Sequence, residues 1–457
     1  MRRWRVASDR DVGAARDARA FGGYTFNVSD GSETFPLWYG MTEGYPWSQP
    51  VDGARYDALH AGVRLRPRDV TVASYPKTGT TWVEQIVLLL LHGSGVAPKL
   101  DPASRNSYVP GRRDVGCVWL EPTVASRRGG RFTLDQFDAI PAPRVIKSHA
   151  PFDSLVGTRS VPGKRGVDAL KASGSRVVYV SRNPKDAAVS LYFQRAPVPG
   201  PARGRRPPPA DAARPRGLAR PPAARRRPLA AADAARAPAA RRRPPAAGAA
   251  GRPRGRRDAG RRPGEERGRR RRLAAARPTR RMPMDAWCAL YTKGYMASGS
   301  YFEHVARWHA ASRAPGSPVL FLKYEALRAD PRKQIRRIAA HLGLERDAAE
   351  IDRVADLSSF ERMKASAAAA DAGARSDARN PKYAVAPGGN SSNPAHTTGH
   401  IREGGSGGWV QHFSKLLSDQ FDAEYRRQLD GYAAKAAADF GVDVEAPTFD
   451  FGGGCVA

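Results

Sequence analysis

Cysteine is scarce in this chain, and its placement argues against two kinds of protein. The three cysteines, Cys117, Cys288 and Cys455, lie far apart in a chain of 457 residues. They form neither a CxxC pair nor the dense set of a disulfide-stabilised secreted scaffold. The sequence also has no HExxH motif and no cluster of Cys and His. We therefore expect a reduced protein of the cytoplasm that binds no metal.

Long hydrophobic runs are also missing. The longest, "IVLLLLHG" at 86–93, is shorter than the roughly 20 apolar residues that span a bilayer. The N-terminus has no apolar core segment, so no secretory signal is expected. Three Asp within residues 1–21 disfavour a transit peptide. We expect no membrane association, with organelle import as the less favoured alternative.

Lysine is absent from residues 195–281, although this segment holds 28 Arg. With five acids the segment has a net charge of +23, against +9 for the rest of a chain whose total is +32. It contains three Leu and no aromatic residue, which is too little apolar surface to offset the entropy lost on ordering. We expect a disordered insert rich in Arg, Pro and Ala.

Three interpretations of this insert stay open. It is a solvated linker, a segment that binds nucleic acid or another polyanion, or a stretch that is not native protein and derives from a retained intron or a misread frame. Because a functional basic tract usually mixes Lys with Arg, the absence of Lys favours the third interpretation. Nucleic-acid binding is the least favoured of the three.

Outside the insert, short β-branched runs alternate with helical patterns, which indicates a parallel sheet with helices on its faces. Strands are expected at 69–75, 142–149, 175–182 and 318–327, and helices at 80–93, 184–194, 330–344 and 418–441, the last with Ser418 as N-cap. The expected divisions are an N-terminal extension with little regular structure (1–50), two parts of one α/β domain (51–194 and 282–445), the insert (195–281) and a C-terminal tail (446–457).

The stretch "SYPKTGTTW" joins the first of these strands to a helix. Such a junction directs backbone N–H groups and the positive end of the helix toward one point, which is an anion site. Gly79 permits close backbone approach, Thr78, Thr80 and Thr81 add hydroxyl groups, and Lys77 adds a positive charge. The order differs from a Walker A loop, because Lys77 precedes the glycine. An ordinary turn with a surface lysine is the alternative.

Two further strand ends carry polar side chains. "VIKSHAP" places Lys147 and His149 at the carboxyl end of a strand, where α/β proteins bind ligands. A histidine there can accept a proton from a hydroxyl group. "YVSRNPKDAAVS" places Arg182 after the next strand and Ser190 about two helical turns later, and an arginine can bind a phosphate through two hydrogen bonds. Taken alone, a histidine at a strand end is more often structural, and the arginine could equally pair with a surface carboxylate.

In this order and spacing, the three stretches resemble the motifs of cytosolic sulfotransferases. "GSYFEHVARW", "VLFLKYEALRADPRKQIRRIAAHLG" and "SSFERMKA" are similar to the later helices and strand of the same family. The resemblance covers roughly 54–194 and 284–440. It implies a single P-loop-like α/β domain with a central parallel sheet flanked by helices and interrupted by the insert.

The resemblance also implies an activity. Members of this family transfer a sulfuryl group from 3′-phosphoadenosine 5′-phosphosulfate to an acceptor oxygen or nitrogen, without a metal. By analogy, His149 would be the general base, Lys77 would stabilise the leaving phosphate, and Lys147 would contact the sulfuryl oxygens. The implied donor-binding residues are Lys77, Thr78, Gly79, Thr80 and Thr81 at the 5′ end, Arg182 and Ser190 at the 3′-phosphate, and Trp82, Tyr324, Ser358 and Phe360 around the nucleoside.

A last motif departs from the family pattern. "REGGSGGW" aligns Arg402 and Gly404 with residues that bind the 3′-phosphate, but Glu403 replaces a lysine. A carboxylate there would weaken donor binding by repulsion unless it points to solvent. The alternative function is thus a weak or inactive member that binds nucleotide or polyanions.

The acceptor and the oligomeric state are not defined by the sequence. The family's short dimerisation motif is absent where "HFSKLLSDQ" stands, so oligomerisation by that route is doubtful. We expect a small-molecule acceptor with a hydroxyl or amine group, and a long loop at 365–408 close to its pocket.

Overall fold

The structure, a computed structural model, describes part of the chain. Backbone alone is described for four N-terminal strands, 53–57 and Arg195; side chains are described for 58–93, 117–121, 133–159, 161–194, 282–296, 298–366 and 403–449. All of these lie in one compact unit of Met1–Val198 and Arg280–Ala457. The second unit, Pro199–Thr279, and with it the disorder expected for 195–281, lies outside the described residues, as do most of the loop expected at 365–408 and most of the tail.

The N-terminal extension contains regular structure, so the expectation of little regular structure there was wrong. It forms a four-stranded antiparallel sheet of β1 (Arg5–Val6), β2 (Gly23–Ser29), β3 (Thr34–Thr42) and β4 (Tyr45–Trp47), in that order. The β2 sequence alternates Tyr24, Phe26 and Val28 with smaller residues, and Asp-Gly follows it at 30–31. Such an alternation before a turn signal is typical of a hairpin.

The central sheet is parallel, as the sequence predicted. Its five strands are β5 (Val70–Ser74), β6 (Cys117–Trp119), β7 (Val145–Ser148), β8 (Arg176–Ser181) and β9 (Val319–Lys323). They lie in the order β6-β7-β5-β8-β9, with every neighbouring pair parallel. Because β5 lies between β7 and β8, the chain reverses direction across the sheet at β5, and ligands of open α/β sheets bind at such a reversal.

Both faces of this sheet are buried, which explains the β-branched composition of its strands. Val70 and Val72 of β5 contribute to one hydrophobic cluster, whereas Ala73, one residue further along, contributes to the other. In β8, Val178 and Tyr179 divide between the same two clusters. Successive side chains of a strand point to opposite faces, so each cluster receives every second residue.

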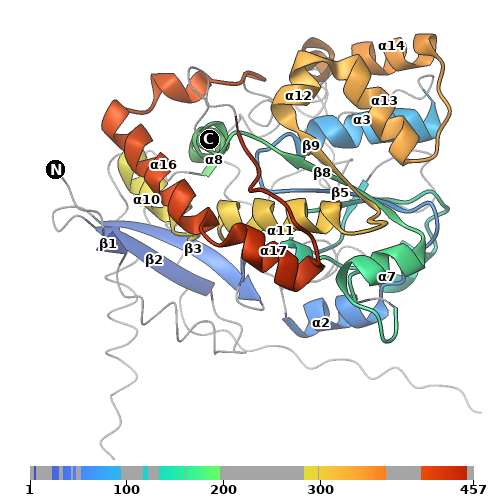
Figure 1. The fold of residues 1–457 in the computed structure, drawn as a ribbon, viewed down its shortest axis with the longest axis horizontal. Coiled ribbons are helices and arrows are strands. Elements are labelled where there is room, and N and C mark those ends of the chain that lie inside the picture. Colours follow the sequence, from blue (N-terminus) through green and yellow to red (C-terminus); the bar gives the residue numbers. More distant parts are fainter. Residues whose placement is uncertain are drawn as a thin grey trace, which may run out of the picture. The chain divides into compact units, whose positions relative to one another are not determined.

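Helices cover both faces of the sheet (Figure 1). One face packs against α3 (Thr80–His92), α12 (Tyr324–Ala329), α13 (Pro331–His341) and α14 (Ala348–Leu357). The other packs against α8 (Pro184–Arg195), α10 (Met284–Thr292), α11 (Tyr301–Arg313) and α16 (Lys415–Leu429). The remaining elements are α2 (Gly53–Gly62), α6 (Leu134–Asp138), α7 (Gly166–Ser173), α17 (Tyr432–Phe440), and the 3-10 turns η1 (Phe152–Ser154) and η4 (Gly408–Gln411). Within the described residues, no helix is long and apolar enough to cross a membrane.

The helix expected at 418–441 is in fact two helices, α16 and α17. Gly431, with a φ of 71°, lies between them in the left-handed region that favours glycine and interrupts helical geometry. The N-cap of α16 is Ser414, which accepts a hydrogen bond from the Leu417 amide at 3.2 Å. Ser418, expected as the cap, instead accepts a hydrogen bond from Lys185 Nζ at 2.7 Å.

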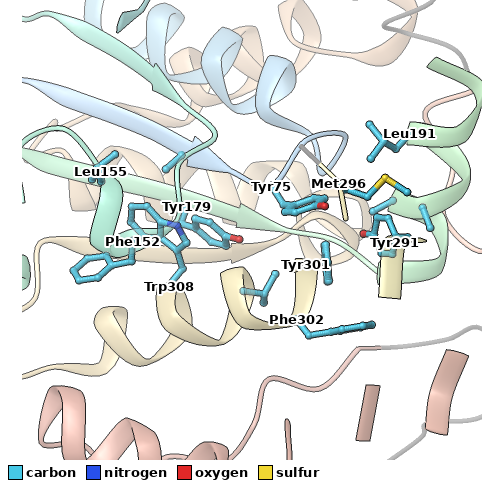
Figure 2. Packing of buried hydrophobic residues seen from close by; sticks show 14 of the residues in the cluster. Tyr75, Phe152, Leu155, Tyr179, Leu191, Tyr291, Met296, Tyr301, Phe302 and Trp308 are labelled. Atoms are coloured by element: carbon cyan, nitrogen blue, oxygen red, sulfur yellow. The ribbon is translucent and has the colours of Figure 1, made fainter. Parts of the chain in front are cut away.

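Aromatic side chains fill the core beneath the carboxyl end of β5 (Figure 2). The Tyr75 ring meets the edges of Tyr301 and Tyr291 at centroid distances of 5.1 and 5.9 Å, and Tyr179 stacks on Trp308 at 4.9 Å. Edge-to-face and stacked pairs each add to the stability that burial provides. The core thereby fixes Tyr75, the first residue of the loop that carries the anion-site motif.

Candidate active site

The strand ends bring the predicted site residues to one edge of the sheet. Lys77 follows β5, His149 follows β7, Arg182 follows β8 and Tyr324 follows β9. The registers pair Ala73 with Ser148, Ser74 with Val180 and Ser181 with Lys323, so the four strands end at nearly the same level. Four distant parts of the sequence therefore converge at the edge where parallel sheets bind ligands.

The loop after β5 adopts a conformation that only a small set of residues tolerates. Lys77 has a φ of 73° and Gly79 a φ of 106°. A Cβ atom at Gly79 would lie 2.7 Å from the Tyr324 ring, so this glycine permits a close approach as well as a positive φ. Since α3 begins at Thr80, the loop presents its backbone N–H groups at a helix N-terminus.

The threonines of this loop differ in what they contact. Thr78 is fully buried, and its hydroxyl lies 2.8 Å from the Tyr75 carbonyl and 2.9 Å from the Val180 carbonyl. Its side chain thus ties the loop to β8 and leaves only its backbone for a ligand. The Thr80 hydroxyl hydrogen-bonds to the Ser74 hydroxyl, and Thr81 is half-buried at the start of α3.

His149 is oriented by the end of β5. Its Nδ1 lies 2.9 Å from the Ser74 carbonyl and 3.3 Å from the Ser74 hydroxyl. A carbonyl can only accept, so Nδ1 carries the proton and donates it, which makes Nε2 the basic nitrogen of the neutral ring. The Trp119 ring meets the His149 ring edge-on at a centroid distance of 5.2 Å.

Lys147 has a carboxylate partner that the sequence did not reveal. Its ammonium lies 3.2 Å from Glu84 Oε1 and 5.0 Å above the Trp119 ring. Both Lys147 and Glu84 are buried, and removing one charge of such a pair leaves the other uncompensated. The sequence signal was the position of Glu84, an acid in the second turn of a helix whose next turns, Ile86 to Leu91, are apolar.

A second carboxylate, Glu121, was also missed. It follows β6, is 1% exposed, and accepts a hydrogen bond from the Ser148 hydroxyl. Burial raises the pKa of Glu121 to about 7, although the Ser148 hydrogen bond and the Lys147 ammonium act in the opposite direction. An acid directly after a short buried strand was the signal that could have identified it.

Arg182 is held by two backbone carbonyls. Its Nη1 donates to the Lys77 carbonyl at 3.2 Å and its Nη2 to the Gly405 carbonyl at 2.7 Å. Its guanidinium lies 4.5 Å above the Tyr324 ring, and the Tyr301 hydroxyl donates to the Arg182 carbonyl. Its Nε is buried and has no hydrogen-bond partner among the described residues. A buried, unpaired guanidinium N–H is a donor suited to an anion.

Tyr324 contacts both the loop after β5 and the glycine-rich segment at 403–409. Its hydroxyl donates to the Gly404 carbonyl at 2.9 Å, and its ring meets Trp82 edge-on at a centroid distance of 5.6 Å. The Trp82 Nε1 is buried without a hydrogen-bond partner in the described part of the chain. The two aromatic rings therefore form one wall beside the loop.

The glycine-rich segment is fixed from α8. Asp186 accepts hydrogen bonds from the amides of Gly407 at 2.7 Å and Trp409 at 3.0 Å. Gly404 has a φ of 64°, and a Cβ there would overlap the Phe360 ring. Predicted residues of two separate motifs, Phe360 and Gly404, are thus in contact.

Four further residues were predicted to bind the donor, and the structure describes three of them. Ser358 is buried at the end of α14 with its hydroxyl 3.4 Å from the Ala355 carbonyl, and Ser190 is half-buried on α8. Glu403 is exposed, whereas Arg402 lies outside the described residues. In the described part of the chain, no group of three or more His, Cys, Asp or Glu could hold a metal ion.

Comparisons with known proteins identify one family. A model of the sulfotransferase domain matches residues 67–199 and 271–433, and leaves out the middle of the Arg-rich insert. Mouse sulfotransferase 1B1 is 22% identical, covering 87% of this chain and 94% of its own length; mouse sulfotransferase 2B1 is 24% identical, covering 89% and 84%. Among solved structures, retinol dehydratase in complex with androsterone and inactive cofactor PAP is 17% identical with a TM-score of 0.48, covering 93% of this chain and 96% of its own.

The family match spans well over half of the chain and includes the loop after β5, the β7 strand end, Arg182 and Tyr324. The chain therefore belongs to the sulfotransferase family and is an enzyme of sulfuryl transfer.

Proposed function

We propose that the protein transfers the sulfuryl group of 3′-phosphoadenosine 5′-phosphosulfate to a hydroxyl or amine of a small-molecule acceptor. The observation that carries this proposal is the orientation of His149. Its Nδ1 is directed to the Ser74 carbonyl beside the anion loop, so that Nε2 is the basic nitrogen. A base at the same sheet edge as an anion site is the arrangement that transfer of an anionic group to a hydroxyl requires.

The proposed step is an in-line displacement. His149 Nε2 takes the proton of the acceptor hydroxyl, the acceptor oxygen forms a bond to sulfur, and the bond from sulfur to the bridging oxygen of the phosphate breaks. The leaving phosphate takes the electron pair, and its charge is stabilised by Lys77 and the N–H groups at the start of α3. Lys147 balances charge on the sulfuryl oxygens. Positioning and electrostatics supply most of the catalysis in such transfers.

The described residues fit this donor. Within the described residues, neither the buried Nε of Arg182 nor Nε1 of Trp82 has a hydrogen-bond partner, and the donor offers a phosphate and a nucleoside edge. A Cβ at Gly79 would overlap the Tyr324 ring, and a Cβ at Gly404 would overlap the Phe360 ring. These two glycines therefore keep the wall around Tyr324 open. Glu403 is exposed, so its carboxylate can turn to solvent and the repulsion expected from the sequence is reduced. Thr78, Gly79, Thr80 and Thr81 would surround the 5′ end.

Calorimetry tests the donor site directly. The full chain should bind 3′-phosphoadenosine 5′-phosphate with micromolar affinity, and Arg182→Ala should weaken this by at least about tenfold, since a charge-assisted hydrogen bond is lost. Arg332→Ala, which removes an exposed arginine of α13, is the matched control. Binding of equal strength by wild type and Arg182→Ala would refute the assignment of Arg182.

Turnover separates the proposed function from its alternative, a weak or inactive member that only binds nucleotide or polyanions. A panel of phenols, aliphatic alcohols, sterols and amines, assayed with the donor, should contain acceptors that wild type sulfates. Donor binding without transfer to any of them would favour the alternative.

We also propose that the enzyme works in the cytoplasm, and the scarcity of cysteine is consistent with this location.

A further inference from the structure

Glu121 is a buried carboxylate directly behind the strand end that bears Lys147 and His149. Its Oε1 accepts the Ser148 hydroxyl, whereas its Oε2 is buried and has no hydrogen-bond partner among the described residues. Leaving a carboxylate oxygen buried and unpaired is costly, so such a group commonly has a role that offsets the cost. The reaction proposed above does not use Glu121.

Ser148 connects Glu121 to the backbone on both sides of His149. Its hydroxyl donates to Glu121 and accepts from the Ala150 amide at 3.0 Å, so it bridges over the histidine. The His149 carbonyl lies 3.3 Å from Nε2 of His304. The ring of His149 is therefore oriented through Ser74, and its backbone through Ser148 and His304.

We propose that Glu121 is a positioning residue that holds His149 through Ser148, and that it does so well only as a carboxylate. This inference rests on the proposed function, because it assumes that His149 is the base. An ionised Glu121 makes a charge-assisted hydrogen bond with Ser148, which is about twice as strong as a neutral one. Protonation weakens that bond. It also adds a buried O–H group, and Oε2 has no hydrogen-bond partner among the described residues that could accept from it.

Burial makes the ionisation of Glu121 sensitive to pH near neutrality. It raises the pKa of this carboxyl to about 7, although the Ser148 hydroxyl and the Lys147 ammonium of β7 favour the charged form. Glu84 of α3 lies 3.2 Å from the same ammonium and neutralises part of its charge. The rings of His149 and Trp119 meet edge-on at the same strand end.

The test compares wild type with Glu121→Gln, the isostere of the protonated acid. At pH 8.5, kcat/KM of Glu121→Gln should be about fivefold below wild type, the difference between a charged and a neutral hydrogen bond. At pH 5.5, where wild type is protonated as well, the ratio should approach one, with a midpoint near 7. A ratio that does not change with pH would overturn the inference, because a packing role alone does not titrate.

A double-mutant cycle tests the route through Ser148. In Ser148→Ala, the additional change Glu121→Gln should leave kcat/KM unaltered at every pH, whereas Ser148→Thr, which keeps the hydroxyl, should restore the pH-dependent ratio. A ratio that still depends on pH in Ser148→Ala would overturn this route and assign the effect to the charge of Glu121 acting directly.

Thermal unfolding supplies a readout that needs no acceptor. The pKa of Glu121 is raised on folding, so between its unfolded value of about 4.5 and its folded value of about 7 the folded state binds more protons. Folded-state stability from this group is therefore lost as the pH rises, and the Tm of wild type relative to Glu121→Gln should fall between pH 5 and 8. A Tm difference between wild type and Glu121→Gln that does not change with pH would show that Glu121 does not titrate in this range, and would overturn the inference. Absence of transfer by wild type would refute the proposed function while leaving this measurement valid.

Discussion

At the residue scale, His149 shows how a single contact selects a chemical role. The bond from Nδ1 to the Ser74 carbonyl fixes the tautomer, so the second ring nitrogen, Nε2, is the basic one. Arg182 and Tyr324, which we propose to bind the nucleotide, follow other strands. Catalysis and donor binding should therefore respond separately to substitution.

His149→Ala should lower kcat by about 10²–10⁴-fold, the usual effect of removing a general base. Affinity for 3′-phosphoadenosine 5′-phosphate, measured by calorimetry, should change by less than about twofold, because Arg182 and the wall formed by Trp82 and Tyr324 are not altered. His92→Ala is the control: it lies about 18 Å along α3 from Thr80 and should leave both quantities unchanged. An unaltered kcat in His149→Ala would mean that another group is the base.

The sequence was sufficient to identify those site residues that directly follow a strand. Lys77, His149 and Arg182 each follow a recognisable strand, so their position at the sheet edge could be predicted. The positions of Glu84 and Glu121 in the chain were signals of burial, but their partners could not be predicted. Lys147 and Ser148 are distant in sequence and reach these carboxylates only after the sheet has formed.

At the element scale, the two ends of α3 illustrate the difference between backbone strain and a steric requirement. Gly79 at the start and Gly93 at the end both have positive φ, at 106° and 83°. Among the described residues, a Cβ at Gly93 would meet no atom within 4 Å, whereas one at Gly79 would meet Tyr324 at 2.7 Å. The same substitution at the two ends therefore separates the two effects.

Gly79→Ala and Gly93→Ala should each lower the free energy of unfolding by about 1–2 kcal/mol through strain at positive φ, measured by urea denaturation. Only Gly79→Ala should also displace Tyr324 and weaken binding of 3′-phosphoadenosine 5′-phosphate, by about tenfold or more. Equal loss of binding in both variants would show that general destabilisation, and not the contact with Tyr324, is responsible.

Asp186 offers a second test at this scale, because it joins α8 to the glycine-rich segment. Asp186→Asn keeps one acceptor oxygen for the amides of Gly407 and Trp409 and loses the other, together with the charge. Nucleotide affinity should fall by about three- to tenfold, the value of one ordinary hydrogen bond. Asp168→Asn, at an exposed position in the first turn of α7, should have no effect.

At the scale of the whole molecule, the sequence predicted four of the five strands of the parallel sheet, because runs such as β5 and β8 are buried and rich in β-branched residues. It did not predict the three-residue strand β6. It did not predict the N-terminal sheet, whose residues were judged by their few apolar repeats and not by the alternation in β2. It also joined α16 to α17, since the helical pattern continues on both sides of Gly431. Errors of this kind arise where one glycine or one turn outweighs a longer periodic signal.

The Arg-rich insert is testable on the same scale. The family match omits its middle, and every described residue of the proposed donor site lies outside it. Replacing 195–281 by a short linker should therefore change affinity for 3′-phosphoadenosine 5′-phosphate by less than about twofold at fixed salt. Tight binding by the shortened chain alone would indicate that the insert is not native protein. Binding lost on shortening would instead make it a functional part of the enzyme.

The two carbonyl bonds of Arg182 have a thermodynamic consequence. Immobilising an arginine side chain costs up to about 2 kcal/mol of rotamer entropy. Here the Lys77 and Gly405 carbonyls already hold the guanidinium in the folded protein, with Nε left for a ligand. Folding bears that entropic cost, so a nucleotide that reaches Nε loses little further conformational freedom in this side chain. On our proposal that Arg182 binds the donor, donor affinity should depend on how firmly the carbonyls of Lys77 and Gly405 are held.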